Sequence, residues 1–392
     1  MIQPNITQYF CLIVAFLLAN CQQYHRMEIG TYLTQQTPQN PSCSTTERSP
    51  EATRLPLPKF VLVLLHGLAM DASENDKIKA AAEEAFGKYI LIIQPKCREG
   101  LKSSYLSIEA QGKQVAAEIQ ATLHDRYPQY TKEELKDLQI SIFGYSQGGL
   151  VGCMLAANHS NDLNITAIVT AHAPLYGTDA LDNTVADVKK FTTKAKPGLA
   201  AIGHPDISQV NMNIAAWLLN GRCVSTFTKF LFKGLSDMRR DATCISRIKQ
   251  FIRENKNDTG SHNIPILLIG GYLSNLAECF DYAKEHEDKV QKLNKYYALL
   301  TTKQKYGLHD ILIPLKSQLC RGASFDNLTS PGNDSVYTHN VATYVSKDQL
   351  HCWNLMLILS NYRVHYGKTL FQNKEAIACI IEFLATHNHL SI

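Results

Sequence analysis

The sequence lacks the features that mark proteins binding nucleic acid or a metal ion. It has 39 Lys and Arg against 35 Asp and Glu, a formal net charge of only +4, and no stripe of positive side chains. A protein that binds nucleic acid normally concentrates Lys and Arg on one face. None of the eleven cysteines stands in a CxxC pair or in a Cys/His run with zinc spacing. We therefore expect no nucleic-acid partner and no metal.

The N-terminus also lacks the positive charge that normally precedes an export signal. The apolar run Tyr9–Ala19 has about the length of a signal-peptide core and is short for a membrane span, but no Lys or Arg precedes it. The run continues into Asn20 and Cys21, a partial match to the bacterial lipoprotein signal. We expect residues 1–21 to be a signal peptide or lipoprotein-type signal. The protein would then be exported, either secreted or anchored to the cell envelope. A retained N-terminal anchor is the alternative.

Residues 22–58 have no hydrophobic period and are rich in Gln, Thr, Pro and Ser, which predicts a flexible linker. If the protein is exported, one or two disulfides between cysteines in the less regular parts of the chain are plausible. Their pairing cannot be read from the sequence. The candidates are Cys43, Cys97, Cys223, Cys244 and Cys320.

From Lys59 onward, short and continuously apolar runs alternate with helical patterns. Runs of this kind are typical of strands that are buried on both faces, and their alternation with helices predicts a parallel sheet. The expected strands are 60–65, 89–93, 138–143, 165–170, 264–269 and 341–345, and the expected helices are 72–86, 108–126, 147–158 and 373–386. We therefore expect an α/β domain over residues 59–392, with a mostly parallel central sheet and helices on both faces.

Two stretches interrupt the alternation. Residues 171–263 separate the fourth strand from the fifth by roughly 90 residues, too many for a structureless loop. Apolar, helix-like pieces at 214–219 and 227–235 predict a helical lid insertion at about 171–263, over one end of the sheet. A smaller helical excursion is expected at 271–308.

The strongest chemical signal is a G-x-S-x-G motif at Gly144–Gly148, between a predicted strand and a predicted helix. In this context the chain turns sharply, and the central serine stands at the apex with strained backbone angles. Side chains at Gly144 and Gly148 would collide across such a turn. The motif therefore makes Ser146 the candidate nucleophile, at a helix N-terminus where developing negative charge is favoured.

A serine nucleophile that attacks an acyl group also needs two preorganised N–H donors for the oxyanion. One is expected to be the N–H of Gln147, directly after the serine. The other is expected to be the N–H of Leu68, because the loop that follows the first strand opens on the same edge of the sheet. The neighbouring His66 is expected to hold this loop rather than to act as the base.

The serine further needs a histidine base and a carboxylate that orients it, in the chain order serine, acid, histidine. Asp310 is the preferred acid, because aliphatic residues and Pro314 follow it. His351 is the preferred base, because it follows the last predicted strand after a short loop. Alternatives for the acid are Asp326, Asp334 and, less well placed, Asp281, and alternatives for the base are His339 and His365.

Together these segments resemble the α/β-hydrolase superfamily, in its lipase/esterase branch, over roughly residues 59–387. The matching pieces are His66-Gly67, the elbow Gly144–Gly149, the acid loop Asp310–Pro314, the His351 loop and the segment Ala171–Thr178. The resemblance implies hydrolysis of carboxylic esters or thioesters through an acyl-enzyme, without a cofactor. The distance of about forty residues between Asp310 and its strand departs from the usual pattern.

A lid and an export signal favour a lipid or another acyl ester as the substrate of a lipase, phospholipase or esterase. The apolar pieces of the lid, or a lipid on Cys21, would then contact a membrane surface. Two alternatives stay open: an acyl-thioesterase or acyltransferase with the same three residues, and a non-enzymatic envelope protein on a hydrolase scaffold.

Overall fold

The computed structural model describes residues 54–182, 185–201, 232–257, 263–279, 284–304, 307–321, 340–351 and 368–390. The chain divides into two units, Met1–Pro56 and Leu57–Ile392, and the fold given below is that of the second. The expected N-terminal signal, most of the expected linker and the lid piece at 214–219 lie outside the described residues.

A six-stranded sheet forms the centre of the second unit, and each adjacent pair of its strands is parallel. The strand order is β2-β1-β3-β4-β5-β6. The strands are β1 (Phe60–Leu65), β2 (Ile90–Ile93), β3 (Gln139–Tyr145), β4 (Ile165–Ala171), β5 (Ile266–Tyr272) and β6 (Val341–Lys347). The expected parallel sheet is confirmed, with strand ends that differ from the expected ones by a few residues.

The register brings the carboxyl ends of the middle strands to one edge. Leu65 at the end of β1 pairs with Gly144 in β3, and Tyr145 pairs with Ala171 at the end of β4. The alignment continues past the strands, because the N–H of Ser146 donates to the carbonyl of Ala171 over 2.8 Å. Residues that directly follow β1, β3 and β4 are therefore neighbours, as parallel strands require.

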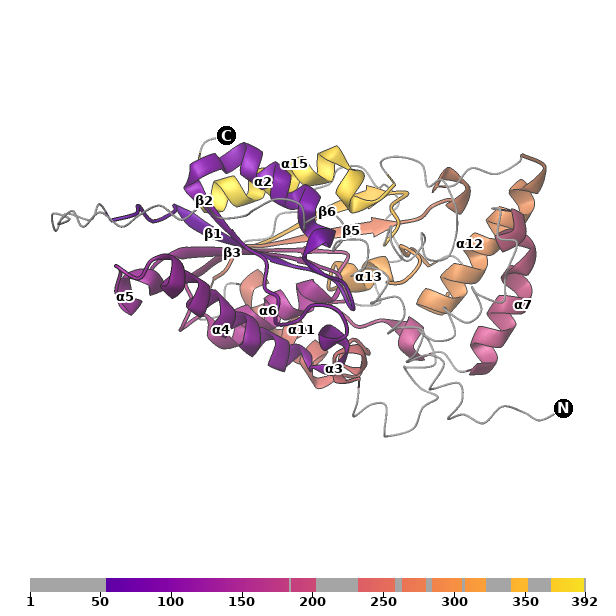
Figure 1. Cartoon of the computed structure of the whole chain (residues 1–392). Helices are drawn as coiled ribbons and strands as arrows, with labels where there is room; N and C mark the ends of the chain where they lie inside the picture. Colours follow the sequence, from indigo (N-terminus) through magenta and orange to yellow (C-terminus); the bar gives the residue numbers. More distant parts are fainter. Residues whose placement is uncertain are drawn as a thin grey trace, which may run out of the picture. The chain divides into compact units, whose positions relative to one another are not determined.

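Helices cover both faces of the sheet (Figure 1). One face carries α2 (Asp76–Phe86) and α15 (Lys374–His387), and the other carries α4 (Ile108–Arg126), α6 (Gln147–His159) and α11 (Thr243–Lys256). Alternate strand residues pack against α2 and α15 in a fully buried core, including Phe60, Leu62, Leu64, Phe143 and Ile380. Burial of such side chains is the main favourable contribution to folding. Within the described part of the chain, no helix has the length and apolarity needed to cross a membrane.

The described parts of the interval between β4 and β5 pack in two different places. Helix α7 (Val185–Ala201) packs against α12 (Glu287–Thr302), which belongs to the second excursion (Figure 1). The two helices share a small apolar core that includes Phe191, Val290 and Leu293. Helix α11 instead packs against α6 and belongs to the layer on the sheet. The lid expected at 171–263 therefore includes a helix of the main body, and its central part lies outside the described residues.

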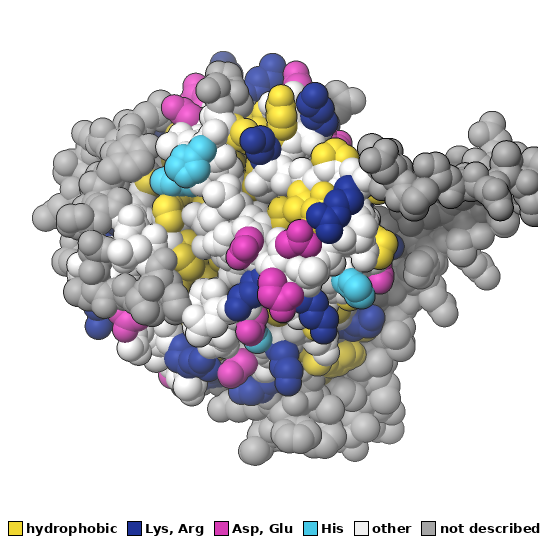
Figure 2. All heavy atoms as spheres, turned by 90° about the vertical axis from the view of Figure 1, so that its left-hand side faces the viewer, with side chains coloured by type: hydrophobic (Ala, Val, Ile, Leu, Met, Phe, Trp, Pro, Cys, Tyr) yellow, Lys and Arg dark blue, Asp and Glu magenta, His cyan; other side chains and the backbone are white. Residues whose placement is uncertain are grey.

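Short elements complete the unit. They are η1 (Ala72–Asn75), η2 (Gly87–Tyr89), α3 (Lys102–Tyr105), α5 (Lys132–Lys136), η3 (Asp179–Asp182), α10 (Lys233–Ser236), η4 (Leu276–Cys279), η5 (Lys284–His286), α13 (Leu315–Gln318) and η7 (Leu370–Gln372). Side-chain caps fix several helix starts, since Ser107 accepts from the N–H of Ala110 and Asn373 from that of Ala376. Lys and Arg are interspersed with Asp and Glu at the end of the molecule where the strands begin (Figure 2).

Three of the five cysteines that are candidates for disulfides lie in the described residues. Cys97, Cys244 and Cys320 are free thiols, and burial raises the pKa of each to about 12. Cys43 and Cys223 lie outside the described residues.

Two glycines give opposite predictions for stability. A Cβ at Gly148 would lie 2.3 Å from the carbonyl oxygen of Leu65, whereas the nearest atom to a Cβ at Gly112, inside α4, is 3.6 Å away. We expect Gly148→Ala to lower the free energy of unfolding by about 3 kcal/mol or more through the clash. Gly112→Ala should raise it by about 0.5–1 kcal/mol through helix propensity. Urea unfolding of both variants checks this, and equal effects would contradict it.

Candidate active site

The turn after β3 holds Ser146 in the strained conformation that the motif predicts. Its backbone angles are φ 53° and ψ −123°, and it stands at the N-cap position of α6. The flanking glycines are required, because a Cβ at Gly144 would lie 2.4 Å from the carbonyl oxygen of Gly148. Such a strained, sharply turned residue at a sheet edge is typical of a nucleophile elbow.

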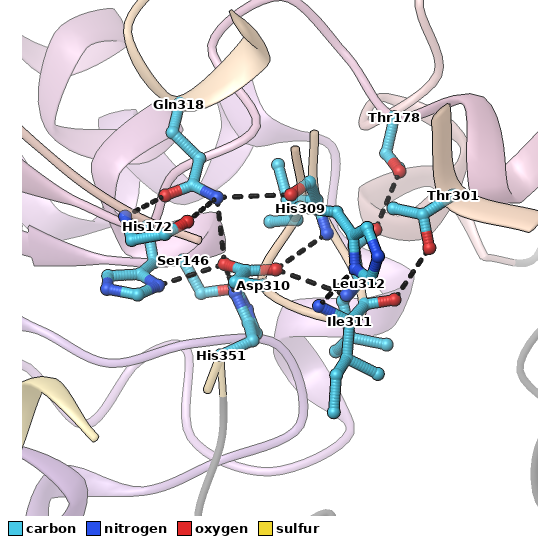
Figure 3. Close-up of polar contacts among 12 residues, drawn as sticks. Ser146, His172, Thr178, Thr301, His309, Asp310, Ile311, Leu312, Gln318 and His351 are labelled. Atoms are coloured by element: carbon cyan, nitrogen blue, oxygen red, sulfur yellow. Dashed lines mark hydrogen bonds and ion pairs between the residues drawn. The ribbon is translucent and has the colours of Figure 1, made fainter. Parts of the chain in front are cut away.

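The structure brings Ser146, His351 and Asp310 together (Figure 3). The Ser146 Oγ lies 2.9 Å from Nε2 of His351, and Nδ1 of His351 lies 2.7 Å from Oδ2 of Asp310. Because the ionised Asp310 only accepts hydrogen bonds, Nδ1 of His351 carries the proton and Nε2 is free to accept the serine hydroxyl. Their catalytic roles remain predictions, and the alternative acids and bases Asp281, Asp326, Asp334, His339 and His365 lie outside the described residues.

The loop that carries Asp310 returns to the sheet after α12. The N–H of Leu273, directly after β5, donates to the carbonyl of His309 over 2.8 Å, and the N–H of His351 donates to the carbonyl of Asp310 over 3.0 Å. The acid loop is thus attached to the ends of β5 and β6, although the sequence separates it from β5 by an excursion. Two threonines, Thr178 and Thr301, also donate to carbonyls of this loop (Figure 3).

The carboxylate of Asp310 is completely buried and accepts several hydrogen bonds. Its Oδ1 accepts from the N–H groups of Leu312 and Ile313 at 3.1 and 2.8 Å. Burial acts to raise the pKa of Asp310, but the charge of His351 and the hydrogen bonds from both nearby histidines lower it more. The pKa therefore lies well below its usual range, and the group is an anion at neutral pH.

Two residues that the sequence did not single out also bind Asp310. Nδ1 of His172 lies 2.9 Å from Oδ2, and Nε2 of Gln318 donates to the same oxygen over 3.0 Å (Figure 3). The position of His172 directly after β4 was a signal for it, because Ser146 follows β3 in the same way. Gln318, in α13, gave no such signal.

Asp310, His172 and His351 are of the types that bind metals, and their donor atoms lie within 4.8 Å of one another. However, each Nδ1 faces the same carboxylate oxygen at hydrogen-bond distance. Donors that face an acceptor in this way are directed at that oxygen rather than at a common ion. Burial lowers the pKa of His172, so it is neutral and donates through Nδ1.

The loop after β1 lies beside the nucleophile, as expected. A Cβ on Gly67 would be only 3.3 Å from Cβ of Ser146, so the backbone approaches closely because this residue is glycine. The N–H groups of Leu68 and Gln147, the two expected oxyanion donors, have no hydrogen-bond partner among the described residues. A pair of free N–H groups beside Ser146 suits the binding of an anionic oxygen.

Three side chains support the loop. Nδ1 of His66 lies 2.8 Å from the carbonyl oxygen of Gly67, and burial lowers the pKa of His66 to about 3, so it is neutral. Glu74 accepts from the N–H of Gly67, and the buried Arg98 donates to the carbonyl of His66. The expected structural role of His66 fits this contact, whereas Glu74 and Arg98 carried no signal in the sequence.

Comparisons with known proteins give one family and several solved structures. The model of the palmitoyl protein thioesterase family matches residues 61–221. A thermostable carboxyl esterase from Bacillus coagulans is 12% identical, with 86% of this chain and 92% of that chain covered and a TM-score of 0.35. A monoacylglycerol lipase from Paleococcus ferrophilus is 13% identical, with 83% and 94% covered and a TM-score of 0.36. No curated protein matches the chain.

The partly buried Glu74 generates a prediction about pH. Burial raises its pKa from 4.5 to about 7, against the opposing effects of the Gly67 hydrogen bond and of nearby positive charge. Between these values the folded protein holds a proton that the unfolded chain has released, so stability falls as pH rises from about 4.5 through 7. We expect Glu74→Gln, which has no proton to lose, to gain stability relative to the wild type over this range.

Urea unfolding of both proteins at pH 5 and pH 8 measures the effect. The exposed Glu83, on α2, supplies the control, since Glu83→Gln removes the same charge from the surface. A difference between wild type and Glu74→Gln that is the same at both pH values would contradict the prediction.

Proposed function

We propose that this chain is a serine hydrolase of the α/β-hydrolase type, and that it cleaves acyl esters through an acyl-enzyme on Ser146. The observation that carries the proposal is the continuous hydrogen-bonded line from Ser146 through His351 to the buried Asp310. It lies where an acyl carbonyl can also meet the free N–H groups of Leu68 and Gln147. Acyl transfer needs a nucleophilic serine, an imidazole oriented to take its proton, and two N–H donors directed at the developing oxyanion.

The reaction follows from the geometry. Nε2 of His351 takes the hydroxyl proton as the Ser146 oxygen forms a bond to the acyl carbonyl carbon. The carbonyl oxygen becomes an anion and accepts hydrogen bonds from the N–H groups of Leu68 and Gln147. The carbon–oxygen or carbon–sulfur bond to the leaving group then breaks, and His351 returns the proton to the alcohol or thiol. A water molecule, deprotonated by the same imidazole, releases the acid and restores Ser146.

The anionic Asp310 contributes to this cycle without exchanging a proton. Its depressed pKa keeps it ionised, so it stabilises the positive charge that forms on His351 during each attack. It also fixes the tautomer of the imidazole, as its contact with Nδ1 requires.

Two substrate classes fit this chemistry. The first is a carboxylic ester of a lipid or another acyl group, as expected of a lipase, phospholipase or esterase. The second is an acyl thioester, favoured by the match of residues 61–221 to the palmitoyl protein thioesterase model. Transfer of the acyl group to an alcohol instead of water would use the same residues. The proposed export and a proposed contact with a membrane, through the lid or a lipid on Cys21, would bring the enzyme to lipid substrates.

Ser146→Ala tests the reaction itself. We expect hydrolysis of acyl esters to fall by about 10⁴-fold or more, because the variant retains only the oxyanion donors and substrate binding. A fluorophosphonate probe should label the wild type and leave Ser146→Ala unlabelled. Ser141→Ala, in the same strand and bonded to Asn388, is the matched control and should keep its activity and labelling.

Either of two results would contradict this proposal. Activity that persists in Ser146→Ala would remove the nucleophile. A folded wild type that neither reacts with the probe nor hydrolyses any ester or thioester would favour a non-enzymatic protein on a hydrolase scaffold.

A matched pair of substrates separates the ester classes. The purified protein is given a palmitoyl thioester and the corresponding palmitoyl oxygen ester, and kcat/KM is measured for each. Each kcat/KM is divided by the rate constant for hydroxide-catalysed hydrolysis of the same substrate. If the thioester is the natural class, we expect this quotient to be at least about tenfold larger for the thioester than for the oxygen ester. An excess for the oxygen ester would support the lipase reading, and added alcohol acceptors would detect transfer.

A further inference from the structure

Two side chains of opposite charge type hold the two ends of one peptide bond in the loop after β1. Nη1 of the buried Arg98 donates to the carbonyl oxygen of His66 over 2.6 Å. The N–H of Gly67 donates to Oε2 of Glu74, also over 2.6 Å. That carbonyl and that N–H belong to the same peptide unit, directly before the one that carries the Leu68 N–H.

We propose that Arg98 and Glu74 form a peptide clamp that fixes the orientation of the His66–Gly67 peptide and thereby holds the Leu68 N–H ready for the oxyanion. This inference rests on the proposed function and adds two positioning residues to it. Neither residue is proposed to touch the substrate.

The chemistry of the two side chains explains why the clamp has one allowed orientation. A guanidinium has only donors, and the Glu74 carboxylate has only acceptors once it is ionised, above its pKa of about 7. A rotated peptide would turn its N–H toward Arg98 and its carbonyl toward Glu74, so that both hydrogen bonds would be lost and both new contacts would be repulsive. A peptide unit also has a dipole of about 3.5 D, which the present arrangement aligns with the two charges.

Arg98 also contacts Gln147, the residue that supplies the second expected oxyanion donor. Its Nη2 donates to Oε1 of the Gln147 side chain over 3.2 Å, while Nε2 of Gln147 donates to the carbonyls of Ser103 and Gly234, each over 3.1 Å. One guanidinium therefore links the loop after β1 to the residue that supplies the other free N–H. The planar, forked donor set of arginine suits such a double contact.

Burying the charged side chain of Arg98 has a cost in folding free energy, and a role in the site would explain why it is buried. The side chain is completely buried, and its hydrogen bonds go to uncharged oxygens, those of His66, Gln147 and Gln111. Among the described residues it has no carboxylate within ion-pair distance. Burying a cation without a paired anion carries a large desolvation penalty, although burial lowers its pKa only to about 10, so it stays charged. The geometry indicates that Arg98 places a positive charge behind the two oxyanion donors.

The rest of the loop is fixed by other hydrogen bonds that leave the Leu68 N–H free. The N–H of Ala69 donates to Oγ of Ser103 over 2.7 Å, and the N–H of Gly100 donates to the carbonyl of Met70 over 2.8 Å. These bonds hold the far side of the loop, and the peptide clamp holds the near side, beside Ser146.

Kinetics of substitution variants test the clamp. Arg98→Met, Glu74→Leu and the double variant remove its ends, while Arg98→Lys and Glu74→Gln keep a donor and an acceptor. Asn255→Leu is the control, because Asn255 is buried and also binds two backbone groups, but before β5, at the opposite edge of the sheet. We measure kcat and KM for an acyl ester, the rate of fluorophosphonate labelling and the thermal midpoint, with kinetics well below the lowest midpoint.

We expect Arg98→Met to lower kcat and the labelling rate together by about 10- to 100-fold, approaching the loss of one oxyanion donor. KM should change by less than about threefold, and Glu74→Leu should lose about tenfold in kcat. The conservative variants should recover part of each loss. Because both side chains hold one peptide, the double variant should lose little more than Arg98→Met alone. Asn255→Leu should lower the thermal midpoint and keep kcat.

Folded Arg98→Met and Glu74→Leu variants with wild-type kcat would overturn the clamp and leave the proposed function intact. Losses that simply multiply in the double variant would also overturn it, since independent residues behave in that way. A wild type that is neither labelled nor hydrolytic would overturn the proposed function, and the clamp with it.

Discussion

The buried carboxylate of Asp310 is the group on which the rest of the site depends. Its Oδ2 receives hydrogen bonds from two segments that are distant in the sequence, through His172 after β4 and His351 after β6, and from the nearby Gln318 in α13. An anion with no exposed surface must be compensated by donors in this way. These hydrogen bonds compensate the buried charge, and the one from His351 also orients the imidazole toward Ser146. The contacts that allow the chain to fold around Asp310 are therefore the ones that position the site.

A second constraint lies on the other side of Ser146, where backbone groups rather than side chains form the site. Gly67, Gly144 and Gly148 allow three chain segments to approach to distances at which any Cβ would collide or crowd. The result is a pair of free N–H groups beside a strained serine. Such preorganisation has a cost in folding free energy, which the fully buried sheet and its helices offset.

Much of the fold was predictable because buried parallel strands have a simple pattern. Strands β1 and β2 are continuous apolar runs, and the other four are short, largely apolar runs between helical patterns. Helix α11 falls within the range of about 171–263 that was expected to hold the lid, yet it packs against α6, and an amphipathic helix looks the same in an insertion and in a layer. Arg98, Glu74 and Gln318 carried no recognisable motif, and only its position directly after β4 marked His172, because the significance of all four lies in hydrogen bonds that the folded chain makes.

The sequence by itself determined the alternation of strands and helices, the elbow at Ser146 and the small residue at Gly67, because backbone strain and close approach dictate residue type locally. It also limited the acid and the base to a few candidates. Only the tertiary structure brought Asp310 back to the end of β5, placed His172 on its carboxylate and set Arg98 and Glu74 on one peptide bond. These hydrogen bonds depend on how the chain packs, and the one between His172 and Asp310 spans 138 residues, which no local pattern encodes.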